Sequence, residues 1–227
     1  MIVKVCGATT EQDVLSAAGA DLVGLWYAVP GGRSELGLSR LADVAAAVRR
    51  DRHARPVLVT LESDPERVAE AVAASDVSWV QLHGYQPPGA VRALRRNTPW
   101  GTTIVKVLHV RGDRCQEQPL IEAYQRAGAD AFLVDAVTGD GRVGSTASSL
   151  DPEVVLALAE RVRLPFMVAG GLGPASRKHF RDVAAHPRFL GIDVDSAVRD
   201  EDGRIRRDRV RALLHAWRGD RYGGVRP

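Results

Sequence analysis

Short apolar segments alternate with amphipathic ones along the whole chain, and this alternation constrains the fold more than any other feature of the sequence. Eight apolar segments are rich in Val, Ile and Leu and contain little polar alternation. Such segments are typical of parallel strands that are buried on both faces. The predicted strands cover residues 2–6, 22–27, 56–61, 79–82, 103–107, 131–135, 166–169 and 190–194.

A helical pattern follows each predicted strand. Asp64-Pro65-Glu66 and Asp151-Pro152-Glu153 both place a capping residue before a proline and an acid, an order that suits the first turn of a helix. The predicted helices cover residues 10–18, 39–49, 64–74, 88–95, 117–127, 151–162, 174–184 and 206–217.

Strict alternation of strands and helices predicts a parallel sheet with right-handed crossovers. It favours an α/β fold in which residues 1–217 form one (β/α)8 TIM barrel, and the length of 227 residues lies within the range of such barrels. A doubly wound open sheet is the alternative. Residues 218–227 contain three glycines and are predicted to form a flexible C-terminal tail.

The composition excludes several classes of protein. No apolar run approaches the roughly 20 residues that a membrane-spanning helix needs, so we expect no membrane association. The net charge of +3 is too even to indicate binding to nucleic acid. Cys6 and Cys115 lie far apart and cannot form a disulfide framework, which favours the cytoplasm.

The basic residues are almost all arginines. Only Lys4, Lys106 and Lys178 are lysines among 31 basic residues, which leaves 28 arginines. Coding bias in a GC-rich genome explains such an excess. The alternative is an anion-binding surface, because the arginine fork matches phosphate and carboxylate groups.

In a barrel, reactive groups lie at the carboxyl ends of the strands and in the loops that follow. Cys6 ends the first predicted strand, where a thiol could act as a base if its pKa were lowered. The alternative is a small buried hydrophobe. Asp135 ends the sixth predicted strand, and a carboxylate there is costly unless it is paired or functional. Its alternative role is a cap or turn contact toward Thr138 and Gly139.

Two further strand ends carry candidate binding groups. Gln81 and His83 end the fourth predicted strand, where they could contact a substrate or make a structural hydrogen bond. Gly170 and Gly171 join the seventh predicted strand to a helix, where backbone N–H groups can close on an anion. Close packing is the alternative explanation for this glycine pair.

Five short motifs, in order along nearly the whole chain, resemble motifs of the phosphoribosylanthranilate isomerase family. Lys4-Val5-Cys6-Gly7-Ala8-Thr9 resembles the family's Lys-x-Cys-Gly-x-Thr, and Gln81-Leu82-His83-Gly84 matches its Gln-Leu-His-Gly. Leu133-Val134-Asp135, Ala169-Gly170-Gly171-Leu172 and Gly191-Ile192-Asp193-Val194 resemble its Leu-Leu-Asp, Ala-Gly-Gly-Leu and Gly-Val-Asp-Val. Each motif is short, but their common order makes the resemblance specific.

The resemblance implies an isomerase of tryptophan biosynthesis. It would convert an aminoaldose phosphate carrying anthranilate into the 1-amino-1-deoxyketose, an Amadori rearrangement, without a metal or an organic cofactor. Cys6 would be the general base that takes the sugar C2 proton, and Asp135 the general acid that protonates the ring oxygen. The expected substrate-binding residues are Arg33, Gln81, His83, Gly144, Ser145, Gly170, Gly171, Asp195, Ser196 and Ala197.

The loops around the implied phosphate site depart from the family pattern. Val143-Gly144-Ser145-Thr146 stands where the family has Gly-Gly-Thr-Gly, and Gly31-Gly32-Arg33 replaces Ser-Pro-Arg. Asp195-Ser196-Ala197-Val198-Arg199 replaces Ser-Ser-Gly-Val-Glu, and Asp195 would place a carboxylate near the phosphate, a contact that weakens binding. The family's following Lys-Asp pair is lost near Ile205-Arg206.

Arginines lie close in sequence to this altered loop. Arg199, Arg204 and Arg206 therefore raise the question of whether arginine side chains replace a lost backbone grip on an anion.

Three functional hypotheses remain open. The first is a phosphoribosylanthranilate isomerase with drifted loops. The second is a relative recruited to specialised metabolism, with a different small-molecule substrate that need not carry a phosphate. The third is a non-catalytic binding barrel, which the retention of both Cys6 and Asp135 argues against.

Overall fold

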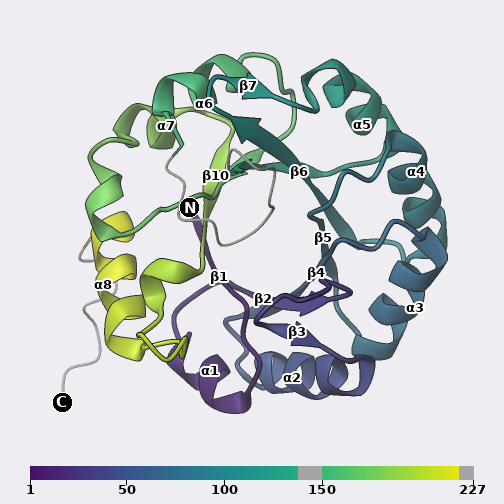
Figure 1. Cartoon of the computed structure of the whole chain (residues 1–227), viewed down its shortest axis with the longest axis vertical. Helices are drawn as coiled ribbons and strands as arrows, with labels where there is room; N and C mark the ends of the chain where they lie inside the picture. Colours follow the sequence, from purple (N-terminus) through teal and green to yellow (C-terminus); the bar gives the residue numbers. More distant parts are fainter. Residues whose placement is uncertain (138–149, 220–227) are drawn as a thin grey trace.

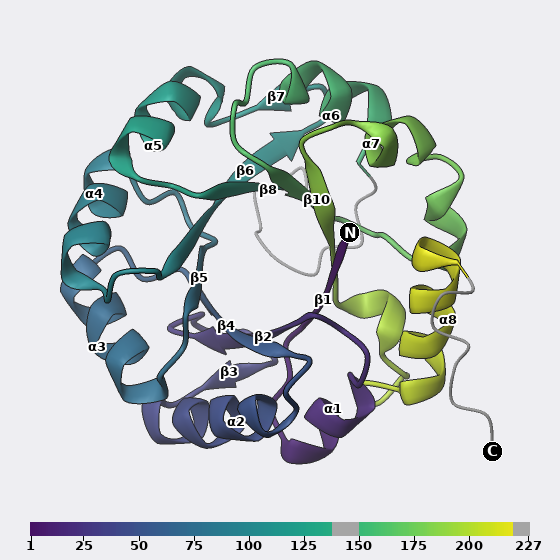
Figure 2. The same cartoon turned by 180° about the vertical axis from the view of Figure 1, so that it is seen from behind.

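The strands form one closed parallel barrel with helices around it, as both views of the chain show (Figures 1 and 2). The computed structural model describes residues 1–137 and 150–219. In the barrel wall the order is β1, β10, β9, β8, β6, β5, β4 and β2, and β2 pairs again with β1. The closed order confirms the predicted TIM barrel and excludes the open doubly wound sheet.

The barrel elements have the following bounds. The strands are β1 (Ile2–Cys6), β2 (Leu22–Tyr27), β3 (Glu35–Leu36), β4 (Arg55–Thr60), β5 (Trp79–Leu82), β6 (Thr103–Arg111), β7 (Arg114–Cys115), β8 (Ala131–Ala136), β9 (Phe166–Val168) and β10 (Phe189–Val194). The α-helices are α1 (Glu11–Ser16), α2 (Leu38–Arg50), α3 (Pro65–Ser75), α4 (Pro88–Asn97), α5 (Ile121–Ala127), α6 (Pro152–Ala159), α7 (Arg181–Ala185) and α8 (Arg207–Arg218). Short 3-10 helices cover η1 (Gln118–Leu120), η2 (Pro174–Arg177) and η3 (Ser196–Val198). Within the described residues, no helix is long and apolar enough to cross a membrane.

The predicted elements agree with the structure except at a few ends. The predicted strands 2–6, 22–27 and 79–82 have the observed bounds. The prediction for 103–107 is too short, because an antiparallel hairpin pairs Val110 with Cys115 and extends β6. The predicted helix 174–184 is wrong in its middle, where the chain turns so that Phe180 is buried against Trp217.

The predicted boundary between barrel and tail stays a prediction, because residues 220–227 lie outside the described part. The helix α8 ends at Arg218, and the guanidinium of Arg218 donates to the carbonyl oxygen of Gly19 at 2.9 Å. This contact fixes the end of α8 against the loop that precedes β2.

The strand residues alternate between two apolar layers. Val3 and Val5 of β1 belong to the large core between the barrel wall and the helices, whereas Cys6 belongs to a smaller cluster inside the barrel. Successive side chains of a strand point to opposite faces, so Lys4 shares the interior with Cys6. The side chains of Lys4 and Cys6 therefore lie inside the barrel near the carboxyl end of β1.

Side-chain caps start several of the helices. Asp64 and Asp151 accept hydrogen bonds from the backbone N–H groups of Glu66 and Glu153, each at 2.9 Å, as the capping pattern predicts. Thr10 caps α1, and Asp13 reaches back to complete a capping box. The box anchors the loop that leads away from Cys6.

The seam between β1 and β10 depends on the absence of a side chain at Gly191. Gly191 lies opposite Ile2 in the register of the two strands. A Cβ atom added at Gly191 would overlap the backbone of Ile2, with the carbonyl oxygen as its nearest atom. Backbone atoms of a central strand cannot move aside without breaking the barrel wall.

We expect Gly191→Ala to lower the free energy of unfolding by about 3 kcal/mol or more, because overpacking here acts on the closing seam. Urea unfolding followed by circular dichroism measures the change. Gly89→Ala is the matched control, since a Cβ atom on this α4 residue meets nothing within 4 Å and alanine favours helix. A loss in Gly191→Ala no larger than in Gly89→Ala would contradict this account of the seam.

Candidate active site

Cys6 lies buried at the carboxyl end of β1, where its sulfur accepts two hydrogen bonds. The ammonium of Lys4 lies 3.1 Å from the sulfur, and the indole Nε1–H of Trp26 lies 3.2 Å from it. Burial and the negative charge of Asp193 raise the pKa of the Cys6 thiol to about 11, although Lys4 and Trp26 act to lower it. The thiol is therefore held in one place by donors that favour its ionised form.

Asp135 lies on β8 and is buried. In the barrel, β10 and β9 separate β8 from β1. His83 Nε2 lies 3.2 Å from Asp135 Oδ2, without good hydrogen-bond alignment. Gln81 Nε2 lies 2.8 Å from His83 Nδ1, so the amide donates to Nδ1 and the imidazole proton is placed on Nε2, facing the carboxylate. Gln81, His83 and Asp135 thus form one connected group.

A buried pair behind His83 supports this group. His109 Nε2 lies 3.0 Å from the carbonyl oxygen of His83, and His109 Nδ1 lies 2.5 Å from Glu117 Oε1. Burial acts to raise the pKa of Glu117, but hydrogen bonds and charge from His109 outweigh it and hold this pKa below its ordinary value. Glu117 therefore stays ionised and fixes the ring of His109.

The loops after β9 and β10 lie side by side at the mouth. Gly170 and Gly171 have φ values of 88° and 63°, which favour glycine. A Cβ atom on Gly173 would lie 3.5 Å from that of Ala197 in η3. Trp217 of α8 donates to the carbonyl oxygen of Gly173 at 3.0 Å and fixes the first loop.

The negative charge of Asp195 is paired with two arginine side chains. Its Oδ2 lies 2.7 Å from Nη2 of Arg33, and its Oδ1 accepts a hydrogen bond from Nε of Arg199. The carboxylate therefore lies between Arg33 in the loop after β2 and Arg199 in its own loop. The expected like-charge contact with a phosphate is weakened by these two guanidinium groups.

Arg199 is a buried clamp and not a surface cation. Its Nη2 donates to the carbonyl oxygens of Cys6 at 3.0 Å and Gly7 at 2.6 Å, and its Nη1 donates to that of Gly203 at 2.6 Å. With Asp195 on Nε, every nitrogen of the guanidinium is used inside the fold. Arg199 therefore ties the loop after β10 to the end of β1.

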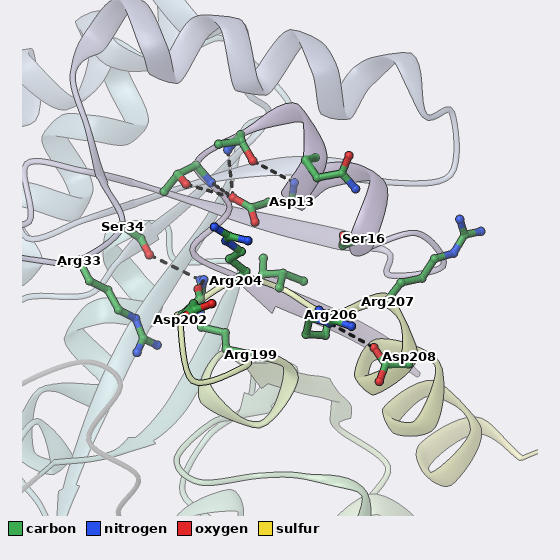
Figure 3. Close-up of a pocket in the computed structure, with 15 residues that line it drawn as sticks. Asp13, Ser16, Arg33, Ser34, Arg199, Asp202, Arg204, Arg206, Arg207 and Asp208 are labelled. Atoms are coloured by element: carbon green, nitrogen blue, oxygen red, sulfur yellow. Dashed lines mark hydrogen bonds and ion pairs between the residues drawn. The ribbon is translucent and has the colours of Figure 1, made fainter.

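Arg204 and Arg206 line a cavity that Arg33 and Arg199 also border. Figure 3 shows this pocket of about 680 Å3, which lies between α1 and the segment that leads into α8. In it, Arg206 lies 3.5 Å from Asp208, and Figure 3 marks this pair. Neither Gly171 nor Ser196 is among the described residues that line the pocket. Arg199, Arg204 and Arg206 thus give no support to the hypothesis that arginine side chains replace backbone contacts with an anion beside Gly171.

The structure brings most of the predicted site residues to one end of the barrel. Cys6, Asp135, His83 and the loops after β9 and β10 all lie at the carboxyl ends of the strands, and Arg33 reaches them through Asp195. Gly144 and Ser145 lie outside the described residues. Within residues 1–137 and 150–219, no cluster of three or more His, Cys, Asp or Glu side chains could hold a metal ion.

Several residues that shape the site were not predicted from the sequence. The sequence did contain a signal for Lys4, because it lies two residues before Cys6 on the same strand and therefore on the same face. Asp193 lies opposite Lys4 in the register of β1 and β10. Glu117 carried no such signal, since it reaches the site from a loop whose path is set by tertiary contacts. The sequence singled out Arg199 as a possible anion-binding residue but gave no sign of its contacts with the carbonyl groups at the end of β1.

Comparison with known proteins places the chain in a family. A family model described as N-(5'phosphoribosyl)anthranilate (PRA) isomerase matches residues 3–216. The chain belongs to the phosphoribosylanthranilate isomerase family. An N-(5'-phosphoribosyl)anthranilate isomerase of Afipia carboxidovorans is 32% identical over 227 residues, which cover 96% of this chain and 89% of that protein. One of Halobacterium salinarum is 36% identical over 207 residues, which cover 88% of each.

Solved structures of phosphoribosylanthranilate isomerases share the fold. The enzyme from Thermus thermophilus superimposes with a TM-score of 0.78 at 24% identity, over 97% of this chain and all of that one. A phosphoribosylanthranilate isomerase in complex with reduced 1-(o-carboxyphenylamino)-1-deoxyribulose 5-phosphate has a TM-score of 0.75 at 22% identity, over 96% of this chain and 100% of that one. Both likenesses cover the barrel from end to end.

We expect Arg199→Met to lower the free energy of unfolding by about 3 kcal/mol, because it leaves buried carbonyl groups and Asp195 without their donor. Chemical unfolding measures the loss. Arg206→Met is the matched control: this exposed arginine makes ion pairs of 3.5 and 3.6 Å, and its loss should cost less than about 1 kcal/mol. Equal losses in the two variants would show that Arg199 is no clamp.

We expect Glu117→Gln to destabilise the barrel by about 1–3 kcal/mol at pH 7, because His109 loses a charged partner. The pKa of Glu117 is lowered from its ordinary 4.5, so its contribution is present above that pH and lost as the pH falls through the folded value. Unfolding measured at several pH values should therefore show the two proteins converging in acid. Glu122→Gln, at an exposed residue of α5, is the control; a difference from wild type that stays constant down to pH 3 would contradict the assignment.

Proposed function

We propose that this chain catalyses the Amadori rearrangement of N-(5'-phosphoribosyl)anthranilate in tryptophan biosynthesis. The observation that carries the proposal is the pair of buried groups, Cys6 and Asp135, at the mouth of a barrel of this family. A small-molecule substrate fits the mouth of such a barrel, where the loops after the strands meet. The free thiol that this chemistry needs is consistent with a reducing cytoplasm.

Asp135 is proposed as the general acid. Its carboxyl proton moves to the ring oxygen of the furanose, the bond between C1 and that oxygen breaks, and the nitrogen lone pair forms a C1=N bond. The product of this step is an open-chain protonated Schiff base. The Nε2–H of His83, 3.2 Å from Asp135, faces the carboxylate that remains.

Cys6 is proposed as the general base. Its thiolate takes the proton from C2, and the electrons of the C–H bond form C1=C2 while the C1=N electrons return to nitrogen. The resulting enol loses its hydroxyl proton and gains one at C1, which gives the 1-amino-1-deoxyketose. The positive charge of the Schiff base favours the thiolate at the moment when it is needed, because opposite charges stabilise each other.

The phosphate is proposed to bind between the loops after β9 and β10. Gly170 and Gly171 allow the backbone to approach an anion closely, and η3 begins at Ser196 beside them. Arg33 is proposed to reach the substrate from the loop after β2 while it is paired with Asp195. The side chain of Ala197, where the family has glycine, faces Gly173, which has no side chain of its own.

A second candidate is a diverged relative that acts on a different substrate. The observation in its favour is the altered loop after β10, where Asp195 and Arg199 carry charges that the family motif places differently. Such a relative would keep the proton transfers of Cys6 and Asp135 and would differ in the anion it holds. A non-catalytic barrel is disfavoured, because both groups remain connected to buried partners.

We expect the purified protein to consume N-(5'-phosphoribosyl)anthranilate, measured as the loss of anthranilate fluorescence. Cys6→Ala and Asp135→Ala should each lower kcat by at least about 100-fold while the circular dichroism spectrum stays unchanged, because each removes one proton transfer. Cys115→Ser is the matched control, since this thiol lies on β7 and should leave kcat within twofold of wild type.

Other outcomes of this experiment separate the candidates. Turnover of N-ribosylanthranilate without turnover of the phosphorylated substrate would favour the diverged relative. Full activity in Cys6→Ala or Asp135→Ala would contradict the assigned roles. No turnover of either compound by a folded protein at high concentration would overturn the proposed function.

A further inference from the structure

Lys4 is fully buried inside the barrel, directly beside the sulfur of Cys6. Its Nζ lies 2.6 Å from Oδ2 of Asp193 and 3.1 Å from Sγ of Cys6. Lys4 stands opposite Asp193 in the register of β1 and β10, so closure of the barrel brings the three groups together. The mechanism above does not use Lys4.

Burial of this ammonium is costly, and one carboxylate offsets the cost only in part. Oδ1 of Asp193 is buried and has no hydrogen-bond partner in the described part of the chain. One oxygen of the carboxylate therefore has no donor among the described residues, while the ammonium donates a second hydrogen bond to the sulfur of Cys6. A purely structural pair would gain more from a partner for Asp193 than from a weak acceptor such as a thiol.

We propose that Lys4 is a positioning residue for the proposed base: its ammonium holds the sulfur of Cys6 and stabilises the thiolate over the thiol, while Asp193 limits this effect. The inference rests on the proposed role of Cys6 and deepens it. Lys4 does not touch the substrate; it acts through the sulfur. Asp193 holds the ammonium in place through a hydrogen bond to its Oδ2.

The charged groups that face Cys6 act in opposite directions. Asp193 on β10 and Asp195 in the loop after it raise the pKa of the thiol, and Lys4 on β1 lowers it. Trp26 on β2 also lowers it through its N–H, although indole carries no charge. The pKa of Lys4 itself is raised: burial acts against the charge, but Asp193 and Cys6 outweigh it, so the ammonium persists at neutral pH.

The test measures the thiolate directly in the substrate-free protein. The rate of Cys6 alkylation by iodoacetamide at pH 8 follows the fraction of thiolate, and the full chain carrying Cys115→Ser leaves Cys6 as the one thiol. Adding Asp193→Asn should speed alkylation at least about tenfold, because the negative charge that opposes the thiolate is gone while the amide oxygen can still accept a hydrogen bond from Lys4. Adding Lys4→Met to that variant should slow it at least about tenfold, because the stabilising charge is gone.

A merely structural pair makes the opposite prediction for the second step. If the ion pair only held the strands together, each substitution would loosen the barrel and expose the sulfur further. Alkylation of Lys4→Met/Asp193→Asn at a rate equal to or above that of Asp193→Asn would therefore overturn the proposal. Lys106→Met in the Asp193→Asn protein is the matched control, since Lys106 is equally buried on β6 and bonds to carbonyl oxygens of Gly84 and Val107; it should change the rate less than twofold.

A second pair of variants carries the test if Asp193→Asn does not fold. In the Cys115→Ser protein, Lys4→Gln keeps a hydrogen-bond donor without charge, whereas Lys4→Arg keeps the charge. Alkylation should fall at least about tenfold in Lys4→Gln and stay within threefold in Lys4→Arg. Equal rates in the two variants would overturn the proposal. None of these measurements needs isomerase activity, so a failure of the proposed function leaves their outcome readable.

Discussion

The pairing of β1 with β10 is the contact on which the rest of the structure depends. It closes the barrel, and the same register places Lys4 beside Asp193 and the sulfur of Cys6 in the interior. Gly191 allows the two backbones to meet there. The same pair of strands therefore closes the barrel and positions the proposed base. A substitution that weakens this pairing should also displace Cys6.

Much of the architecture was predictable from local pattern. The buried strands have few polar residues, and cap residues such as Asp64 and Asp151 mark where helices begin, so strand and helix positions follow from the sequence. Cys6 and Asp135 were predicted as candidates because both stand at strand ends, where a barrel collects its reactive groups. The hairpin of β6 and β7 was missed because its two-residue return strand has no periodicity to detect.

The partners of the site residues were less predictable, for a physical reason. Glu117 and Arg199 belong to loops, and a loop shows in its sequence neither where its side chains go nor which buried groups they satisfy. The sequence of the loop after β10 indicated a repulsive carboxylate at Asp195. In three dimensions that carboxylate lies between Arg33 and Arg199. The two guanidinium groups offset its negative charge, so its repulsion of an anion cannot be judged from the sequence. The meaning of a charge depends on contacts that span the fold.

The clamp of Arg199 has a consequence for how this loop can change over generations. Positions 195 and 199 hold one negative and one positive charge that contact each other. Replacing Asp195 alone with the serine of the family motif leaves the buried guanidinium of Arg199 without its carboxylate, next to the carbonyl groups of Cys6 and Gly7. Replacing Arg199 alone with glutamate places a second carboxylate beside Asp195. The route between the two loop sequences therefore passes through a poorly folded intermediate unless both positions change at once. Such coupling isolates this loop from gradual drift, and a transplant of the loop into a relative would have to carry both residues.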